Sequence, residues 1–186
     1  MNDAVAVRIL GIAGSLRRGS YNAATLRAAQ ELAPAGMTIE RFDIAPIPLY
    51  NEDVRQQGFP PPVEDFRGRI KSADGLLIVT PEYNYSIPGV LKNAIDWASR
   101  PPDQPFDGKP IGIMGASMGI HGSSRAQYHL RQCFVFLNGL VMNRAEVMIP
   151  VAQNKFDADG KLTDQPTRDF ITAHLAAFKS WVLRLR

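Results

Sequence analysis

The 186-residue sequence predicts an α/β fold in which helices cover both faces of a parallel sheet, and three observations support this prediction. Short apolar segments alternate along the chain with segments that have helical spacing. The apolar segments lack a strict in–out alternation, which is typical of strands buried on both faces. No internal repeat or Gly/Ser-rich linker interrupts this order, so residues 1–186 are expected to form one domain. Right-handed crossovers then give a doubly wound, three-layer arrangement.

The first third of the chain supplies two strands and two helices. Residues 5–12 are a short Val/Ile-rich run and are expected to form a buried strand. An Ala/Leu-rich helix is expected over residues 22–33, followed by a second strand over 37–43. The Pro-rich stretch 45–62 is too long for an ordinary connection, which indicates a functional or mobile loop. A short helix is expected over 63–72.

The central third contains the clearest strand signal. Residues 74–80 are almost entirely apolar and predict a buried strand, as do residues 110–116. Between them, residues 88–99 predict a helix, with Pro88 near its first turn, where a missing N–H costs little. These elements continue the alternation of strand and helix.

The last third predicts a helix over residues 122–137, a final strand region over 139–148 and a long helix over 166–185. In the last of these, apolar residues recur at alternating spacings of four and three and form one stripe that is expected to pack on the sheet. The stripe consists of Ile171, Leu175, Phe178, Val182 and Leu185.

Composition and charge exclude several classes of protein. Hydrophobic residues make up 45% and charged residues 21% of the chain, which is not a disordered or fibrous composition. The 21 Lys and Arg residues against 18 Asp and Glu give a net charge of +3 that is scattered, which suits anionic small molecules better than nucleic acid. No apolar run reaches the ~18 residues of a membrane span, and no signal-peptide pattern is seen. Cys133 is the only cysteine, so a reducing compartment, the cytoplasm, is expected.

The loop after the first strand has the features of a phosphate site. A loop that enters a helix N-terminus offers unpaired N–H groups and the positive end of a dipole. Ser15, Ser20 and Asn22 add short donors, and Arg17 adds a cation that can bridge two phosphate oxygens. The loop matches neither GxxxxGK[ST] nor GxGxxG and suits a terminal monophosphate better than a magnesium-bound triphosphate. Alternatively, Ser20 or Asn22 merely caps the helix.

The loop after the third strand has the features of a site for a planar ring. It follows a central strand at the edge where doubly wound sheets bind ligands. Tyr83 and Tyr85 can lie against an aromatic ring, and the backbone of residues 82–84 can reach the polar edge of a heterocycle. Alternatives are a rigid structural turn, or an aromatic patch for a partner protein.

Three segments together resemble the NADPH-dependent FMN reductase family, most closely its bacterial chromate and quinone reductases. They are GSLRRGSYN at 14–22, TPEYNYSIPGVLKNAIDWASRP at 80–101 and GKPIGIMGAS at 108–117. The resemblance implies a flavodoxin-like three-layer fold with a five-stranded parallel sheet in the order 2-1-3-4-5. It also implies bound FMN, with NADPH or NADH as electron donor.

The resemblance also carries roles to individual residues. Contacts to the FMN phosphate are implied for Ser15, Arg17, Ser20 and Asn22, and contacts to the isoalloxazine ring for Pro81, Glu82, Tyr83 and Asn84. Ser117 resembles the family's residues beside the flavin. Arg100 is implied at the rim of the active site, although it also suits the C-terminal end of a helix, where the dipole favours a cation.

These observations predict an FMN-dependent NAD(P)H oxidoreductase that reduces quinones, or chromate, azo compounds or free flavin, by a ping-pong mechanism. No catalytic side chain is required, because the cofactor supplies the chemistry, and a general-acid role for His121 is not expected. The alternative is a flavodoxin-type electron carrier. Such carriers are usually strongly acidic, whereas this chain has an isoelectric point near 9.2.

Three further expectations concern helix surfaces. Lys92 and Asp96 are expected to pair on the surface, and Cys133 is expected to be a buried, inert thiol. The helix over 122–137 mixes arginine with aromatic residues, which is typical of an interface. A homodimer or homotetramer is therefore expected, with Arg125, Tyr128 and Glu146 as candidate contacts; Arg125 and Glu146 would pair across a two-fold axis.

Overall fold

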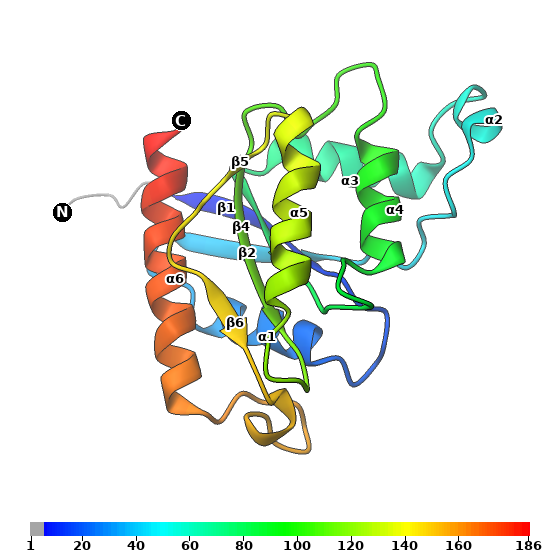
Figure 1. The fold of residues 1–186 in the computed structure, drawn as a ribbon. Helices are drawn as coiled ribbons and strands as arrows, with labels where there is room; N and C mark the ends of the chain where they lie inside the picture. The colour runs from blue at the N-terminus through cyan, green and yellow to red at the C-terminus, as the bar shows by residue number, and fades with distance from the viewer. Residues whose placement is uncertain (1–5) are drawn as a thin grey trace.

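A computed structural model describes residues 6–186 and shows a parallel sheet between two layers of helices (Figure 1). The strands run in the order β2-β1-β3-β4-β5, with β6 also paired to β4, and each pairing is parallel. The predicted fold class and strand order are confirmed. The strands are β1 (Val7–Ala13), β2 (Met37–Phe42), β3 (Gly75–Val79), β4 (Pro110–Ala116), β5 (Leu140–Val141) and β6 (Val147–Ile149).

The helices divide between the two faces of the sheet. Helices α1 and α6 share one buried apolar cluster with the sheet, and α3, α4 and α5 share the other. The helices are α1 (Tyr21–Glu31), α2 (Glu52–Arg55), α3 (Pro61–Ser72), α4 (Gly89–Ala98), α5 (Ser124–Phe136) and α6 (Gln165–Arg184), with a 3-10 turn at Ala152–Asn154. Among residues 6–186, no helix combines the length and apolar character needed to cross a bilayer.

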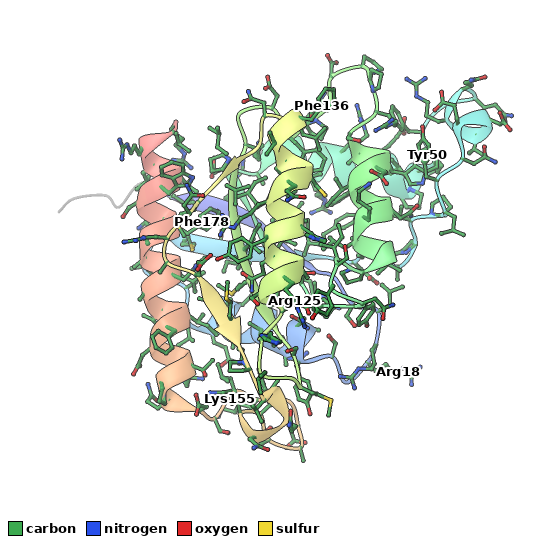
Figure 2. All side chains as sticks on the ribbon, in the orientation of Figure 1. Arg18, Tyr50, Arg125, Phe136, Lys155 and Phe178 are labelled. Carbon is green, nitrogen blue, oxygen red and sulfur yellow. The ribbon has the colours of Figure 1, made fainter. Side chains whose placement is uncertain are left out.

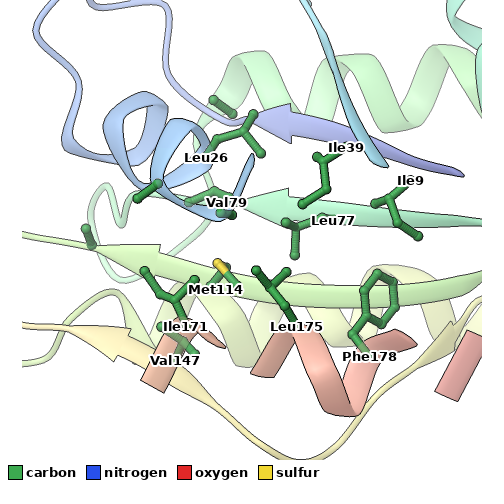
Figure 3. Close-up of a cluster of buried hydrophobic side chains, with 14 of the residues drawn as sticks. Ile9, Leu26, Ile39, Leu77, Val79, Met114, Val147, Ile171, Leu175 and Phe178 are labelled. Carbon is green, nitrogen blue, oxygen red and sulfur yellow. The ribbon is translucent and has the colours of Figure 1, made fainter. Parts of the chain in front are cut away.

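The central strands are buried along their whole length. Every residue of β3 and β4 is buried, as the near-continuous apolar runs predicted. Helix α6 packs its stripe on the same sheet: Ile171, Leu175 and Phe178 are fully buried (Figure 3). Leu185 departs from the prediction, because it ends the helix and is only half-buried.

The predicted strand over 139–148 is wrong as a single element. Its two ends pair with β4 as β5 and β6, and residues 143–146 between them are exposed. This connecting segment reads Asn-Arg-Ala-Glu, and its polar side chains stay in water when the segment leaves the sheet edge.

The Pro-rich segment between β2 and α3 is held against α4. Asn93 donates from Nδ2 to the Pro48 carbonyl at 2.8 Å and accepts from the Tyr50 backbone N–H at 2.8 Å. The indole N–H of Trp97 donates to the same Pro48 carbonyl at 2.8 Å. The segment contains the short helix α2, so only part of it is irregular.

Candidate functional site

Three loops meet in one pocket of about 390 Å³, a size typical of small-molecule sites. The loops follow β1, β3 and β4, which are neighbours in a parallel sheet, so their carboxyl ends lie at the same edge. The predicted cofactor contacts line the pocket, except Asn84 and the rim residue Arg100. The lining consists of Ser15, Arg17, Ser20, Tyr21, Asn22, Pro81, Glu82, Tyr83, Ala116, Ser117 and Met118.

Ser20 caps helix α1 at the floor of the first loop. Its hydroxyl oxygen accepts from the backbone N–H groups of Asn22, at 3.2 Å, and Ala23, at 3.3 Å. Ser20 therefore does cap the helix. A hydroxyl can also donate, however, so the Ser20 O–H is still available to an anion in the pocket. No acidic residue occupies the first turn of α1, which leaves its N-terminus favourable to negative charge.

Asn22 connects α1 to the end of β4. Its Nδ2 donates to the Ala116 carbonyl at 3.0 Å, and its Oδ1 accepts from the Ala116 N–H at 2.9 Å. The side chain is buried, and one Nδ2 hydrogen is left for a ligand. Local sequence contains no signal for this contact, because the two residues are 94 positions apart.

Arg17 is the exposed cation of the first loop. Its guanidinium carbon lies 5.7 Å from the centre of the Tyr21 ring, within cation–π range. The Ser15 hydroxyl accepts from the Arg17 backbone N–H at 3.3 Å, which fixes the bend of the loop. Ser15 itself is buried beneath the loop and lines the pocket.

The second loop forms a tight hairpin. Tyr83 and Ser86 exchange backbone hydrogen bonds of 2.9 and 3.0 Å around the two-residue turn Asn84-Tyr85. Both turn residues are left-handed, with φ of 50° and 66°. Asparagine tolerates this region, but a tyrosine there is uncommon and must be held by its surroundings. Asn84 lies at the tip of the turn, which explains why it does not line the pocket.

The carboxylate of Glu82 faces the start of α5 rather than the pocket. Its Oε2 accepts from the backbone N–H groups of Arg125, at 3.1 Å, and Ala126, at 3.3 Å, and its Oε1 pairs with the Arg125 guanidinium. Burial alone would raise the pKa of Glu82. Hydrogen bonds from the Arg125 side chain and the Ala126 and Arg125 N–H groups outweigh burial and lower that pKa, so Glu82 is ionised.

The third loop is anchored by the segment after β6. Ser117 donates its N–H to the Ile149 carbonyl and accepts from the Ala152 N–H, both at 3.0 Å. Gly115 is needed just before this loop, because a Cβ there would lie 2.0 Å from the Ser123 Oγ and 2.3 Å from the Thr80 carbonyl oxygen.

Comparison with known proteins assigns the chain to a family. The sequence profile of the NADPH-dependent FMN reductase family matches residues 7–154. The chain belongs to the NADPH-dependent FMN reductase family.

Known relatives and a solved structure agree with this assignment. An NAD(P)H-dependent FMN reductase of Pseudomonas aeruginosa is 61% identical over 180 residues, covering 97% of each chain. A quinone reductase of Escherichia coli is 50% identical over 183 residues, again covering 97% of each. The flavoenzyme NAD(P)H:(acceptor) oxidoreductase FerB of Paracoccus denitrificans has a TM-score of 0.87 at 34% identity, covering 96% of this chain and 98% of its own.

The pocket of this FMN reductase family member fits the cofactor chemically. A phosphate monoester needs several donors and a favourable potential, and Ser15, Ser20, Arg17 and the start of α1 offer both. A planar ring needs flat walls, and Pro81 and Tyr83 supply them. The enzyme is therefore an FMN-dependent oxidoreductase that uses NAD(P)H, and the electron-carrier alternative is not supported.

Arg100 lies away from this pocket, at the end of α4. Its Nε donates to the Asp96 carbonyl at 3.0 Å, and another nitrogen donates to the Ser99 hydroxyl at 3.0 Å. Its guanidinium carbon lies 5.6 Å from the Tyr50 ring centre. These contacts match the alternative reading, in which the C-terminal end of a helix favours a cation.

The expected burial of Cys133 is wrong. The side chain is only half-buried, because it faces a groove of about 500 Å³ between α4 and α5. Partial burial raises the pKa of the Cys133 thiol, which favours its neutral form, and its expected lack of reactivity stays a prediction. The predicted surface pair is confirmed, with Lys92 Nζ 2.7 Å from Asp96.

Within one chain Arg125 does not pair with Glu146, and the pairing of these two residues across a two-fold axis stays a prediction. Arg125 pairs with Glu82 of the same chain, and its guanidinium carbon lies 3.6 Å from the Tyr85 ring centre. Glu146 instead lies beside Tyr128, and a hydrogen bond to its carboxylate raises the pKa of the Tyr128 hydroxyl. The N-terminal end of α5 favours a carboxylate, and Glu82 of the neighbouring loop supplies it.

Proposed function

We propose that this enzyme reduces quinones with electrons from NADPH or NADH while FMN is held in the three-loop pocket. The observation that carries the proposal is the meeting of phosphate-type donors at the start of α1 with an aromatic wall from the Tyr83–Ser86 hairpin. The E. coli relative, named quinone reductase, supports a quinone as the acceptor.

The first loop binds the phosphate in this proposal. The hydroxyls of Ser15 and Ser20 donate hydrogen bonds, and Arg17 closes over the phosphate with its guanidinium. Asn22 also lines the pocket, and its remaining Nδ2 hydrogen, which the bond to Ala116 does not use, is assigned to the phosphate. The start of α1 adds its partial positive charge.

The second and third loops hold the ring. Pro81, Tyr83 and Ser117 flank it, and backbone groups meet its polar edge. Ser86 already accepts the N–H of Tyr83, whereas no hydrogen bond within residues 6–186 uses the N–H of Glu82 or Asn84. These two N–H groups are therefore the candidates for the polar edge, which gives Asn84 a backbone role despite its position at the turn.

FMN would supply the hydride-transfer chemistry when bound here, so the first loop would bind its phosphate, the second and third loops would orient its ring, and no side chain is needed as a nucleophile. Donor and acceptor then use the same face in turn, which is a ping-pong mechanism. Purified enzyme should show a flavin absorption band that bleaches with NADPH or NADH without oxygen and returns with p-benzoquinone. Parallel double-reciprocal lines are expected, and intersecting lines would contradict the mechanism.

We further propose a cytoplasmic homodimer or homotetramer that uses the outer face of α5. Val135 and Phe136 are 79% and 94% exposed, and Tyr128 is exposed on the same helix. Figure 2 shows Phe136 at the end of α5. Exposed aromatic and apolar side chains on one helix are typical of subunit interfaces. Arg125 has partners within its own chain, so its pairing with Glu146 across a two-fold axis is not used to support this interface.

A further inference from the structure

We propose that Glu82 and Arg125 are positioning residues: together they hold the Tyr83–Ser86 hairpin against α5 in the conformation that meets the flavin ring. This inference rests on the proposed FMN site. Neither residue needs to contact the flavin through its side chain, since both act through the hairpin between them and the ring.

The Glu82 carboxylate is a helix cap supplied from another segment. Helix α5 begins after Ser123, whose side chain makes no capping hydrogen bond. The first N–H groups of a helix need acceptors, and Oε2 of Glu82 accepts from two of them. The side chain is only 7% exposed and its charge is balanced by Arg125, so the contact is shielded from solvent. Position 82 is thereby tied to α5 directly before the hairpin.

Arg125 completes the clamp from the other side. Its guanidinium pairs with Oε1 of Glu82, and its centre lies 3.6 Å from the Tyr85 ring centre. Tyr85 is one of the two left-handed residues of the turn. A tyrosine leaves that conformation easily unless a contact stabilises it, and the cation–π stack on Arg125 is such a contact.

A third contact shows that α5 supports the whole hairpin. His129, one turn after Arg125, lies with Nδ1 3.1 Å from the Ser86 hydroxyl. Figure 2 places Arg125 at the end of α5 opposite Phe136, beside the loop that follows β3. The helix therefore meets the hairpin at its start, its turn and its end, and a loss of the central contact frees the turn next to Tyr83, which lines the pocket.

The test is a titration of flavin-free protein with FMN and with riboflavin, for wild type, Arg125→Met, Arg125→Lys and Glu82→Gln. The Glu82–Arg125 pair supports the part of the site that holds the ring, which FMN and riboflavin share. Arg125→Met should therefore lower the affinity for both flavins by the same factor. A factor of about ten is expected, which is the effect of losing a supporting contact at metal sites. Arg125→Lys keeps the charge and should recover part of the loss. The bound flavin's visible circular dichroism should change in Arg125→Met.

Controls separate positioning from general destabilisation. Arg131→Met removes another half-buried arginine of α5, one that contacts Met142 and Asn143 instead of the hairpin, and should bind both flavins like wild type. Tyr85→Leu removes the stack at an exposed position, which keeps the test available if Glu82→Gln does not fold.

The proposal predicts that the double variant Glu82→Gln/Arg125→Met binds flavin no more weakly than the weaker-binding single variant. The two substitutions remove the same ion pair, so their effects should not add. The proposal is overturned if Arg125→Met and Tyr85→Leu bind both flavins like wild type, or if only FMN is weakened. If wild type itself binds neither flavin, the proposed function fails instead.

Discussion

Protonation of a buried histidine should make the stability of this enzyme depend steeply on pH below neutrality. His174 is 1% exposed under the sheet, where its Nδ1–H donates to the Ala145 carbonyl and its Nε2 has no hydrogen-bond partner among residues 6–186. Burial lowers the pKa of His174 to about 4, nearby Arg131 adds to the effect, and the Ala145 hydrogen bond opposes it.

The sign follows from the direction of this shift. In the unfolded chain the histidine takes up a proton near pH 6.5, whereas in the folded protein it does so only near pH 4. The stabilising contribution is therefore present above pH 6.5 and is lost as the pH falls from there to about 4. A difference of about 2.5 pKa units corresponds to roughly 3 kcal/mol of unfolding free energy.

Urea denaturation at pH 7, 5 and 4, at one FMN concentration, measures this loss. Leucine cannot be protonated, so the unfolding free energy of the His174→Leu variant should fall by about 3 kcal/mol less than that of wild type between pH 7 and 4. His121→Gln removes an exposed histidine and should keep the wild-type pH dependence. If His174→Leu has the same pH dependence as wild type, the reasoning about burial is refuted.

Three further predictions concern packing and assembly. Gly115→Ala forces a Cβ against Ser123 and Thr80, so the midpoint of thermal unfolding should fall by the equivalent of about 1–3 kcal/mol; an unchanged midpoint would show that the close approach is absent. Phe178→Ala empties a fully buried site on α6 and should cost about 3–5 kcal/mol in urea denaturation, and a cost below 1 kcal/mol would argue against this packing. Phe136→Glu places a charge on the exposed end of α5 and should shift the sedimentation coefficient towards the monomer, whereas an unshifted oligomer excludes this surface as the interface.

Sequence patterns predict the core of this fold well, because burial dictates them directly. The apolar runs of β3 and β4 reflect strands covered on both faces, and the stripe of α6 reflects one face on the sheet. The split of the last strand was missed because apolar residues flank a polar segment of only four residues, 143–146. Periodicity over such short pieces does not distinguish one strand from two.

The candidate site also has a part that sequence predicts and a part that it does not. Loops after neighbouring parallel strands must converge, so the residues of the pocket are predictable from their order in the chain. The partners of polar side chains are not. Glu82 and Arg125 are 43 positions apart in the sequence, and Asn22 and Ala116 are 94 positions apart. Neither contact can therefore be predicted from local spacing. The half-burial of Cys133 likewise depends on how α5 sits beside α4.

The central claim, a phosphate site in the first loop, is tested most directly by comparing FMN with riboflavin on flavin-free protein. Arg17 is the residue to change, because Ser20 also caps α1 and its loss would disturb the helix. A hydrogen bond to a charged group contributes about 1.5–3 kcal/mol. Arg17→Ala should therefore lower the affinity for FMN by one to two factors of ten and leave the affinity for riboflavin unchanged.

Arg18→Ala is the matched control, since Arg18 is an exposed neighbour that does not line the pocket (Figure 2). The account predicts that wild type and Arg18→Ala bind FMN at least tenfold more tightly than riboflavin. In Arg17→Ala the ratio of FMN affinity to riboflavin affinity should be smaller. Equal binding of FMN and riboflavin by wild type, or an equal effect of Arg17→Ala and Arg18→Ala, would contradict the phosphate site.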